Sequence, residues 1–268
     1  MSVLNEVIRA HLHYRKQLFK LAKSDLVKTY KGAALGWAWA FIQPMITIFT
    51  YYFAIAVGLR SGKPVNGCPY FLYLISGMIP WFYMSGTFTG GAGSIRHYRY
   101  LVTKIRYPVC TIPTIVSTSK LMINGVLTVV MLSIFVACGY RPTIYWLQIP
   151  IYFLMMYLFF TAWALFAGML SVMSKDFLHL VQSVKMMLFW MSGILYNVDK
   201  VNNHTIRTIL KFNPITIVAT GYRHSLINKV WIWEDLVTLR NYVIVYVVMV
   251  ALALWVYKRL IKDIPDVL

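Results

Sequence analysis

Long uncharged, apolar segments are the feature that most constrains the fold of this chain. Residues 32–59, 64–95 and 142–174 contain no Asp, Glu, Lys or Arg. A helix of about twenty predominantly apolar residues is long enough to cross the hydrocarbon core of a bilayer. Only 13% of all residues are charged, whereas soluble domains average about 25%. The pattern excludes an ordinary soluble domain and predicts an all-α, polytopic membrane protein.

Six transmembrane helices follow from the spacing of these segments. Their predicted ranges are 35–59, 70–92, 112–138, 148–172, 177–197 and 241–260. Gln43-Pro44 predicts a kink in the first span, because proline removes a backbone donor. Gly86 and Gly90 in the second span have the spacing that lets a neighbouring helix approach closely. The expected organisation is a surface segment, 1–31, followed by a transmembrane domain, 32–268.

The N-terminal segment has the pattern of an amphipathic helix over residues 2–31. Apolar residues recur on one helical face, and basic residues follow the other at steps of three and four. We expect this helix to lie in the cytoplasmic membrane surface rather than to cross it. The alternative is a helix packed on the surface of a partner protein. The basic candidates for contact with anionic lipid or a lipid-carrier pyrophosphate are Arg9, Lys16, Lys20 and Lys23.

Residues 197–240 break the regular succession of spans. They contain six basic and three acidic residues together with short apolar pieces such as 215–218. A structureless loop of this length is uncommon in a compact protein. Half-length helices can dip into a membrane where protein surrounds their ends. We therefore expect re-entrant helices before the last span.

The distribution of Lys and Arg predicts the orientation in the membrane. The N-terminal helix carries seven, the connection between spans two and three carries four, and the C-terminal tail carries three. The two short connections on the opposite side carry two and one. Because cytoplasmic segments are enriched in Lys and Arg, both termini are predicted to be cytoplasmic. Residues 197–240 then lie outside.

Several kinds of chemistry lack their sequence signatures. No Gly-x-x-x-x-Gly-Lys-Ser/Thr loop occurs, and no His, Cys, Asp or Glu cluster has metal-ligand spacing. The predicted topology places no acid at mid-membrane, which disfavours a proton-coupled transporter. We expect no catalytic residue, metal or cofactor in this chain, and predict a transport subunit that takes its energy from elsewhere. A membrane-embedded lipid-linked transferase and an anchoring subunit are the alternatives.

Specific strings carry a resemblance to a known family. Residues 31–39, Gln43-Pro44, residues 77–83, 104–108 and 192–196, and Asn213-Pro214 occur in the order found in type-2 ABC exporter permeases of cell-surface polysaccharides. Within that family, Gly58-Leu59-Arg60-Ser61-Gly62 and the Pro-Trp-Phe-Tyr string at 80–83 are most similar to the wall teichoic acid translocation permease. Permeases for O-antigen or capsule share the general pattern, so those polymers are the alternative substrates.

The resemblance implies a half-transporter in the bacterial plasma membrane. Two copies of this chain would pair with two copies of a separate ATPase, which would bind and hydrolyse ATP with Mg. A lipid-linked polymer, teichoic acid in the first instance, would pass from the cytoplasm between the two membrane subunits. ATPase coupling is expected at the basic and aromatic stretch before the third span and at the next cytoplasmic turn. The candidates are Arg96, Arg99, Tyr100, Lys104, Arg106, Tyr107, Lys175 and Asp176. An ordinary positive-inside loop and a solvated turn are the alternatives.

Residues for the substrate pathway are expected among aromatics, which stack on sugars, and among lysines inside spans, which attract phosphate. The candidates are Trp81, Phe82, Tyr83, Phe88, Trp190, Tyr196, Lys120 and Lys185. Aromatic residues also gather at membrane interfaces or in protein cores without binding any ligand. Lysines inside spans can extend their charged ends to the membrane surface. Both alternatives to a role in the substrate pathway therefore stay open. Arg223 and His224 are candidates for an external gate from their family position alone.

Overall fold

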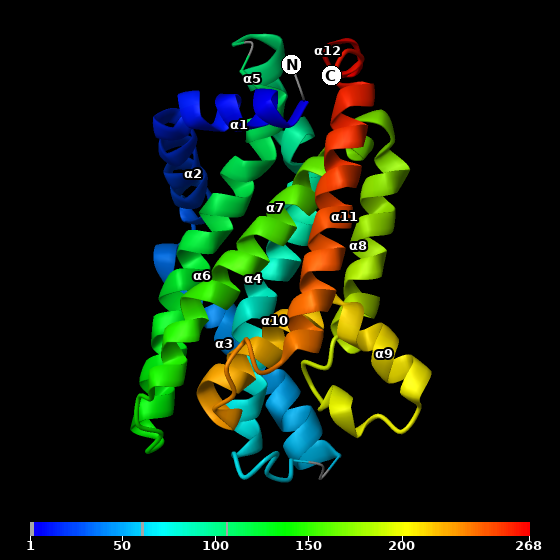
Figure 1. Ribbon diagram of the computed structural model, residues 1–268. Coiled ribbons are helices and arrows are strands. Elements are labelled where there is room, and N and C mark those ends of the chain that lie inside the picture. The colour runs from blue at the N-terminus through cyan, green and yellow to red at the C-terminus, as the bar shows by residue number, and fades with distance from the viewer. Residues whose placement is uncertain (1–2, 60–61, 106) are drawn as a thin grey trace.

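The computed structural model describes residues 3–59, 62–105 and 107–268, and every regular element in these ranges is a helix. The long helices are α3 (Trp39–Tyr52, continued by η2, Phe53–Gly58), α4 (Tyr70–His97), α6 (Ile112–Ala137), α7 (Ile149–Met173), α8 (Lys175–Trp190) and α11 (Leu236–Leu260). The shorter helices are α1 (Val3–His13), α2 (Arg15–Tyr30), α5 (Arg99–Thr103), α9 (His204–Phe212), α10 (Pro214–Arg223) and α12 (Ile264–Val267). The long helices form one bundle, and α1, α5 and α12 lie together at one end of it (Figure 1).

Helix α4 is the centre of the bundle and packs against α6, α7, α8 and α10. Buried residues surround it along its length, as expected for a helix that is apolar on all sides. Gly90 faces α6, where an added Cβ would lie 3.4 Å from Val116. The close helix approach predicted from Gly86 and Gly90 is therefore present in the structure. Gly91 is tighter still, since an added Cβ would lie 2.4 Å from the Cβ of Ala164 in α7.

Each of the six predicted spans coincides with a helix. Among the described residues, four helical stretches are long and apolar enough to cross a membrane by length and composition: Gly36–Gly58, Val109–Ala137, Ile144–Met173 and Leu236–Leu260. The second, α4, is long enough but is less apolar because of its many Gly, Ser and Thr residues. The fifth, α8, has only 16 residues and includes Lys175, Asp176 and Lys185. Crossing by these two helices stays a prediction.

Helix α4 continues to His97, beyond the predicted end at residue 92. Two further span boundaries that differ from the predicted ones have a local reason. The fifth span was predicted to continue to residue 197, but α8 ends at Trp190. The guanidinium of Arg223 donates hydrogen bonds to the carbonyls of Gly193 and Ile194. In a longer helix these carbonyls would accept from backbone N–H groups of the next turn. The last span was predicted from residue 241, but α11 begins at Leu236. Asp235 caps it by accepting a hydrogen bond from the backbone N–H of Thr238.

The N-terminal segment differs from a single helix because it bends at Tyr14, between α1 and α2. Helix α1 lies across the end of the bundle, and α2 runs beside α6 (Figure 1). In α2 the apolar face packs on the bundle through Leu18, Ala22 and Leu26. Helix α2 therefore packs on the bundle of its own chain, and its placement in the membrane surface or on a partner protein stays a prediction. Helix α1 keeps apolar side chains exposed, namely Leu4, Ile8 and Leu12.

Residues 197–240 contain short helices rather than a bare loop, as the length argument predicts. Asn213 caps α10 by accepting from the backbone N–H of Ile215, and Pro214 occupies the first helical position, where no donor is needed. Most of α10 is buried against α4 and α7, whereas α9 buries only Leu210. Re-entry of these helices into the membrane stays a prediction.

Candidate functional site

A cavity of about 270 Å³ lies between α3, α4, α6 and α8, and both lysines predicted inside spans line it. Lys120 comes from α6 and Lys185 from α8. We call this space the lysine cavity. Its other polar lining side chains include Gln43, Thr47, Ser85, Thr89 and Asn124. The structure therefore brings together two basic residues that are far apart in the sequence, among hydroxyl and amide groups.

The two lysines concentrate positive charge in the lysine cavity. None of the described residues that line it is acidic, and neither lysine has a salt bridge within the described part of the chain. The stem of Lys120 packs on Gly86, whose added Cβ would lie 3.6 Å from the Lys120 Cδ. Two lysines in one cavity lined by hydroxyl and amide groups form an arrangement suited to binding an anion.

Of the six aromatic candidates, Phe82 and Tyr83 line the lysine cavity. The Tyr83 hydroxyl shares a hydrogen bond of 2.7 Å with Ser117 of α6, which fixes the ring against the cavity wall. Trp81 and Phe88 are buried elsewhere: Trp81 packs on Phe189, and Phe88 stacks on Trp163 with ring centroids 4.5 Å apart. Core packing, one of the alternatives left open by the sequence, accounts for Trp81 and Phe88.

Trp190 and Tyr196 lie near the end of α8 and remain exposed, by 54% and 36%. Neither lines the lysine cavity. Trp190 makes edge contacts with Tyr51 and Phe189, so its ring lies over the junction of α3 and α8. Their predicted role in the substrate pathway stays a prediction, because an exposed position suits lipid or a second copy equally well.

The predicted coupling residues divide into exposed and structural groups. Arg99, Tyr100 and Lys104 are exposed on and beside α5, and Lys175 and Asp176 are exposed at the start of α8. Arg96 instead donates to the carbonyls of Ser171 and Val172 and holds the C-terminal end of α7. Tyr107 is buried, with its ring edge-on to Tyr14 at 5.1 Å. Arg106 lies outside the described residues.

A contact that sequence reasoning missed ties α2 to the same region. The hydroxyl of Tyr98, between α4 and α5, donates a hydrogen bond to the carboxylate of Asp25 in α2. Burial and this carboxylate raise the pKa of Tyr98, so the hydroxyl stays protonated as a donor. The lone acidic residue among the basic residues of α2 is the sequence signal that could have indicated such a partner.

The basic residues predicted for the surface helix keep exposed side chains. Arg9 lies on α1, and Lys16, Lys20 and Lys23 lie on α2. On α2 they lie opposite the buried Leu18, Ala22 and Leu26. Contact of these side chains with anionic headgroups or pyrophosphate stays a prediction.

Arg223, predicted as an external gate, is a buried connector. Its guanidinium donates to the carbonyls of Gly193 at 2.7 Å and Ile194 at 2.6 Å and lies 3.6 Å from the ring centroid of Tyr73. A cation over an aromatic face is attracted by the ring quadrupole. Arg223 therefore joins α10, the segment after α8, and α4. Its side chain is too deeply buried to meet a passing polymer directly in this conformation.

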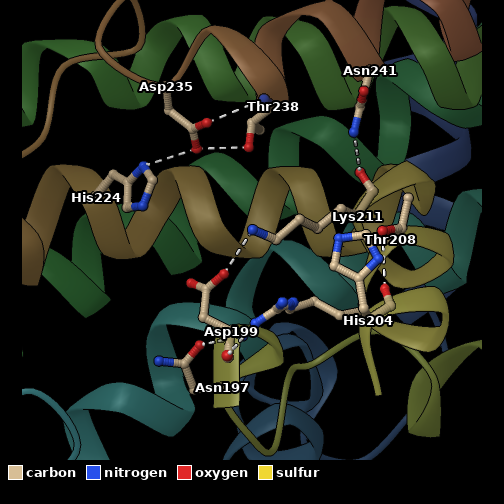
Figure 2. Close-up of polar contacts among 10 residues, drawn as sticks. Asn197, Asp199, His204, Thr208, Lys211, His224, Asp235, Thr238 and Asn241 are labelled. Carbon is tan, nitrogen blue, oxygen red and sulfur yellow. Dashed lines mark hydrogen bonds and ion pairs between the residues drawn. The ribbon is translucent and has the colours of Figure 1, made fainter. Parts of the chain in front are cut away.

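A polar network surrounds this connector at the opposite end of the bundle from α1 and α12. Figure 2 shows the ring of His224 directed toward Asp235, with Nδ1 and Oδ2 3.9 Å apart. It also shows the ion pair of 2.7 Å between Lys211 of α9 and Asp199. A further hydrogen bond runs from Asn241 of α11 to the Lys211 carbonyl. These contacts connect α9 with α11 and the residue after α10 with Asp235 at the start of α11. The predicted gate function of His224 stays a prediction.

Comparison with known proteins gives one family and several relatives. The family model described as ABC-2 type transporter matches residues 16–227. The O-antigen export system permease protein RfbA of Myxococcus xanthus is 29% identical over 219 residues, which cover 81% of this chain and 82% of that protein. A protein of the same name from Klebsiella pneumoniae is 26% identical over 223 residues, covering 81% of this chain and 82% of that protein. A second Klebsiella pneumoniae protein of this name is 24% identical over 217 residues, or 79% and 80% of the two chains.

Proposed function

This chain belongs to the ABC-2 type transporter family, and on that premise we propose that it is the permease subunit of an exporter for a lipid-linked polysaccharide of the O-antigen type. The polymer moves from the cytoplasm across the plasma membrane, and both termini of the permease are cytoplasmic. Two copies of this chain act with two copies of a separate ATPase subunit, which supplies the work. The exposed residues of α5 and of the start of α8 receive the motion of that ATPase.

The observation that carries this proposal is the lysine cavity inside the bundle. A conduit for an anionic, sugar-bearing substrate needs positive charge, hydroxyl groups and aromatic rings at one place, and it must hold the substrate weakly. Lys120, Lys185, Tyr83 and Phe82 provide these groups at the junction of four helices. Charged groups within membrane segments are rare and generally mark the path of an ion or substrate.

The relatives favour O-antigen as the exported polymer over wall teichoic acid. The three relatives reported above are all described as O-antigen export permeases. Teichoic acid remains the second candidate because of the Pro-Trp-Phe-Tyr string at residues 80–83. Two members of that string, Phe82 and Tyr83, line the lysine cavity.

The test is complementation of two export-deficient strains, one lacking its O-antigen permease and one lacking its teichoic acid permease. The chain is expressed in each with its cognate ATPase subunit. The proposal expects surface O-antigen to return only in the first strain and only when the ATPase is present. Restoration of teichoic acid export alone would favour the second candidate. Restoration without any ATPase would contradict both.

A further inference from the structure

A polar cavity of about 70 Å³ lies at the end of the bundle opposite α1 and α12 (Figure 1). Its lining comes from α9, α10, the start of α11, η6 (His224–Asn228) and the segments around Asn66 and Asn197. We call it the histidine cavity. A polar space of about 10–15 Å³ accommodates one water molecule, so the histidine cavity is large enough for water to enter.

The charged residues that line the histidine cavity balance one another while His224 is neutral. Its titratable and charged lining residues are Tyr73, Asp199, Lys211, Arg223, His224 and Asp235. Lys211 and Asp199 form an ion pair of 2.7 Å. The guanidinium of Arg223 is held by backbone carbonyls and by the Tyr73 ring. The remaining carboxylate, Asp235, faces His224, and a proton on His224 adds one positive charge to a balanced set (Figure 2).

His224 and Asp235 face each other at a distance that leaves them without a hydrogen bond. His224 Nδ1 and Asp235 Oδ2 are 3.9 Å apart, and Oδ2 accepts the hydroxyl of Thr238 at 2.6 Å. Glu234, the neighbouring acid, accepts instead from the backbone N–H of Trp231 at 2.9 Å. The side chain of His224 is only 14% exposed, so the structure shields the imidazole from water.

This shielding determines how His224 responds to pH. The residue lies outside the six predicted spans. Burial lowers the pKa of His224, Asp235 and Asp199 oppose that effect, and Lys211 adds to it. A conformation that exposes the ring to water lacks the burial and binds a proton more readily. As the pH falls below about 6.5, the ordinary pKa of histidine, protonation therefore favours the exposed conformation.

We propose that His224 and Asp235 form an acid-sensitive latch at this end of the bundle. While His224 is neutral the latch is closed, as in the structure. When His224 takes up a proton, its ring moves into water and η6 separates from the start of α11. The inference goes beyond the proposed function, because it concerns a response to the pH of the compartment at this end, whatever polymer is exported.

The connection between α10 and α11 is the part that moves. His224 lies at its beginning in η6, and Asp235 lies at its end as the cap of α11. Helix α10 itself is fixed to the segment after α8 through Arg223 and through the hydroxyl of Thr216, which donates to the carbonyl of Ser192 at 3.0 Å. π-Helical segments such as η6 frequently lie at functional sites. Opening therefore changes the connection and leaves α10 in place.

The test follows this connection by fluorine-19 NMR of the full-length chain, labelled with 5-fluorotryptophan in detergent micelles. Trp231 and Trp233 lie within it and stack with ring centroids 4.4 Å apart, so their signals report its conformation. Trp231→Phe and Trp233→Phe assign the two signals. Between about pH 7.5 and about pH 5.5 we expect the population of a second state to rise about threefold.

Two variants and a matched control assign the response to the latch. His224→Gln cannot gain a proton, so its signals should be the same at both pH values. His204→Gln removes an exposed histidine of α9 and should keep the native response. Asp235→Asn retains a side chain that caps α11 but removes the negative charge, so the midpoint of the transition should fall by about 0.5 pH unit.

Three results would overturn the latch. The first is a native chain whose Trp231 and Trp233 signals do not change with pH. The second is a response that survives His224→Gln. The third is a midpoint that stays or rises in Asp235→Asn, and this variant keeps the proposal testable if His224→Gln does not fold. Because the measurement involves neither an ATPase nor transport, its failure is distinct from failure of the complementation test.

Discussion

The hydroxyl of Tyr98 donates a hydrogen bond to the carboxylate of Asp25, and this contact joins the surface helix α2 to the end of the central helix α4. Tyr98 directly precedes α5, which carries the exposed coupling candidates. The segment that precedes α5 is therefore in contact with both α2 and α4.

Tyr98→Phe removes the donor and leaves the ring. Hydrogen bonds to charged groups contribute about 1.5–3 kcal/mol, and because Asp25 is half-exposed we expect a loss of about 1.5 kcal/mol in the free energy of unfolding. Thermal unfolding in detergent measures it. Tyr100→Phe is the control, since the side chain of Tyr100 is exposed. Equal melting temperatures for the two variants would show that the contact contributes nothing.

Arg223→Lys tests the buried connector. A lysine cannot donate to the carbonyls of Gly193 and Ile194 in the same fork or stack flat on Tyr73. Buried carbonyls left without a donor cost about 1–3 kcal/mol each, so we expect a loss of about 2–4 kcal/mol. Arg240→Lys, at an exposed position of α11, is the matched control. A native melting temperature for Arg223→Lys would mean that the carbonyls find other donors.

The helices themselves were predictable from the sequence, because uncharged apolar runs have few alternatives to a helix in a membrane. The residues at which the helices begin and end were less predictable. The end of α8 at Trp190 depends on Arg223, which lies more than thirty residues further along the chain. The bend at Tyr14 accompanies a contact with Tyr107, which is more distant still in sequence. Such boundaries depend on tertiary partners that hydrophobic periodicity does not encode.

The residues of the candidate site were likewise only partly predictable from the sequence. Lysines inside spans were identifiable because charge is costly there, and the structure places both in one cavity. Aromatic residues were harder to separate, since Trp81, Phe82 and Tyr83 are consecutive and a helix directs them to different sides. The structure buries both Trp81, which packs on Phe189, and Tyr83, which packs on Phe160. Nothing in the sequence pattern distinguishes Arg96 from Arg99, yet Arg96 donates hydrogen bonds to backbone carbonyls at the end of α7.

The difference between Arg96 and its basic neighbours gives a prediction about coupling. Arg99→Glu/Lys104→Glu reverses two exposed charges, so it should reduce co-purification of the ATPase subunit at least fivefold without changing the melting temperature. Arg96→Ala should lower the melting temperature instead, because two terminal carbonyls of α7 lose their donor. Pull-down and thermal unfolding are measured on the same preparations. An ATPase that binds the double variant normally would leave α5 as an ordinary positive-inside loop.

Gly91→Ala tests a close contact between α4 and α7. The new Cβ would lie 2.4 Å from the Cβ and 3.0 Å from the Cα of Ala164, so α4 and α7 must move apart. Overpacking of this kind costs typically about 1–3 kcal/mol, and thermal unfolding should detect it. Gly93→Ala, two residues further along α4, meets only Leu178 Cδ1 at 4.0 Å and should be neutral or slightly stabilising, because alanine favours a helix. If both variants melt alike, α4 and α7 are not in contact at Gly91, and the packing of the central helix must differ from the one described.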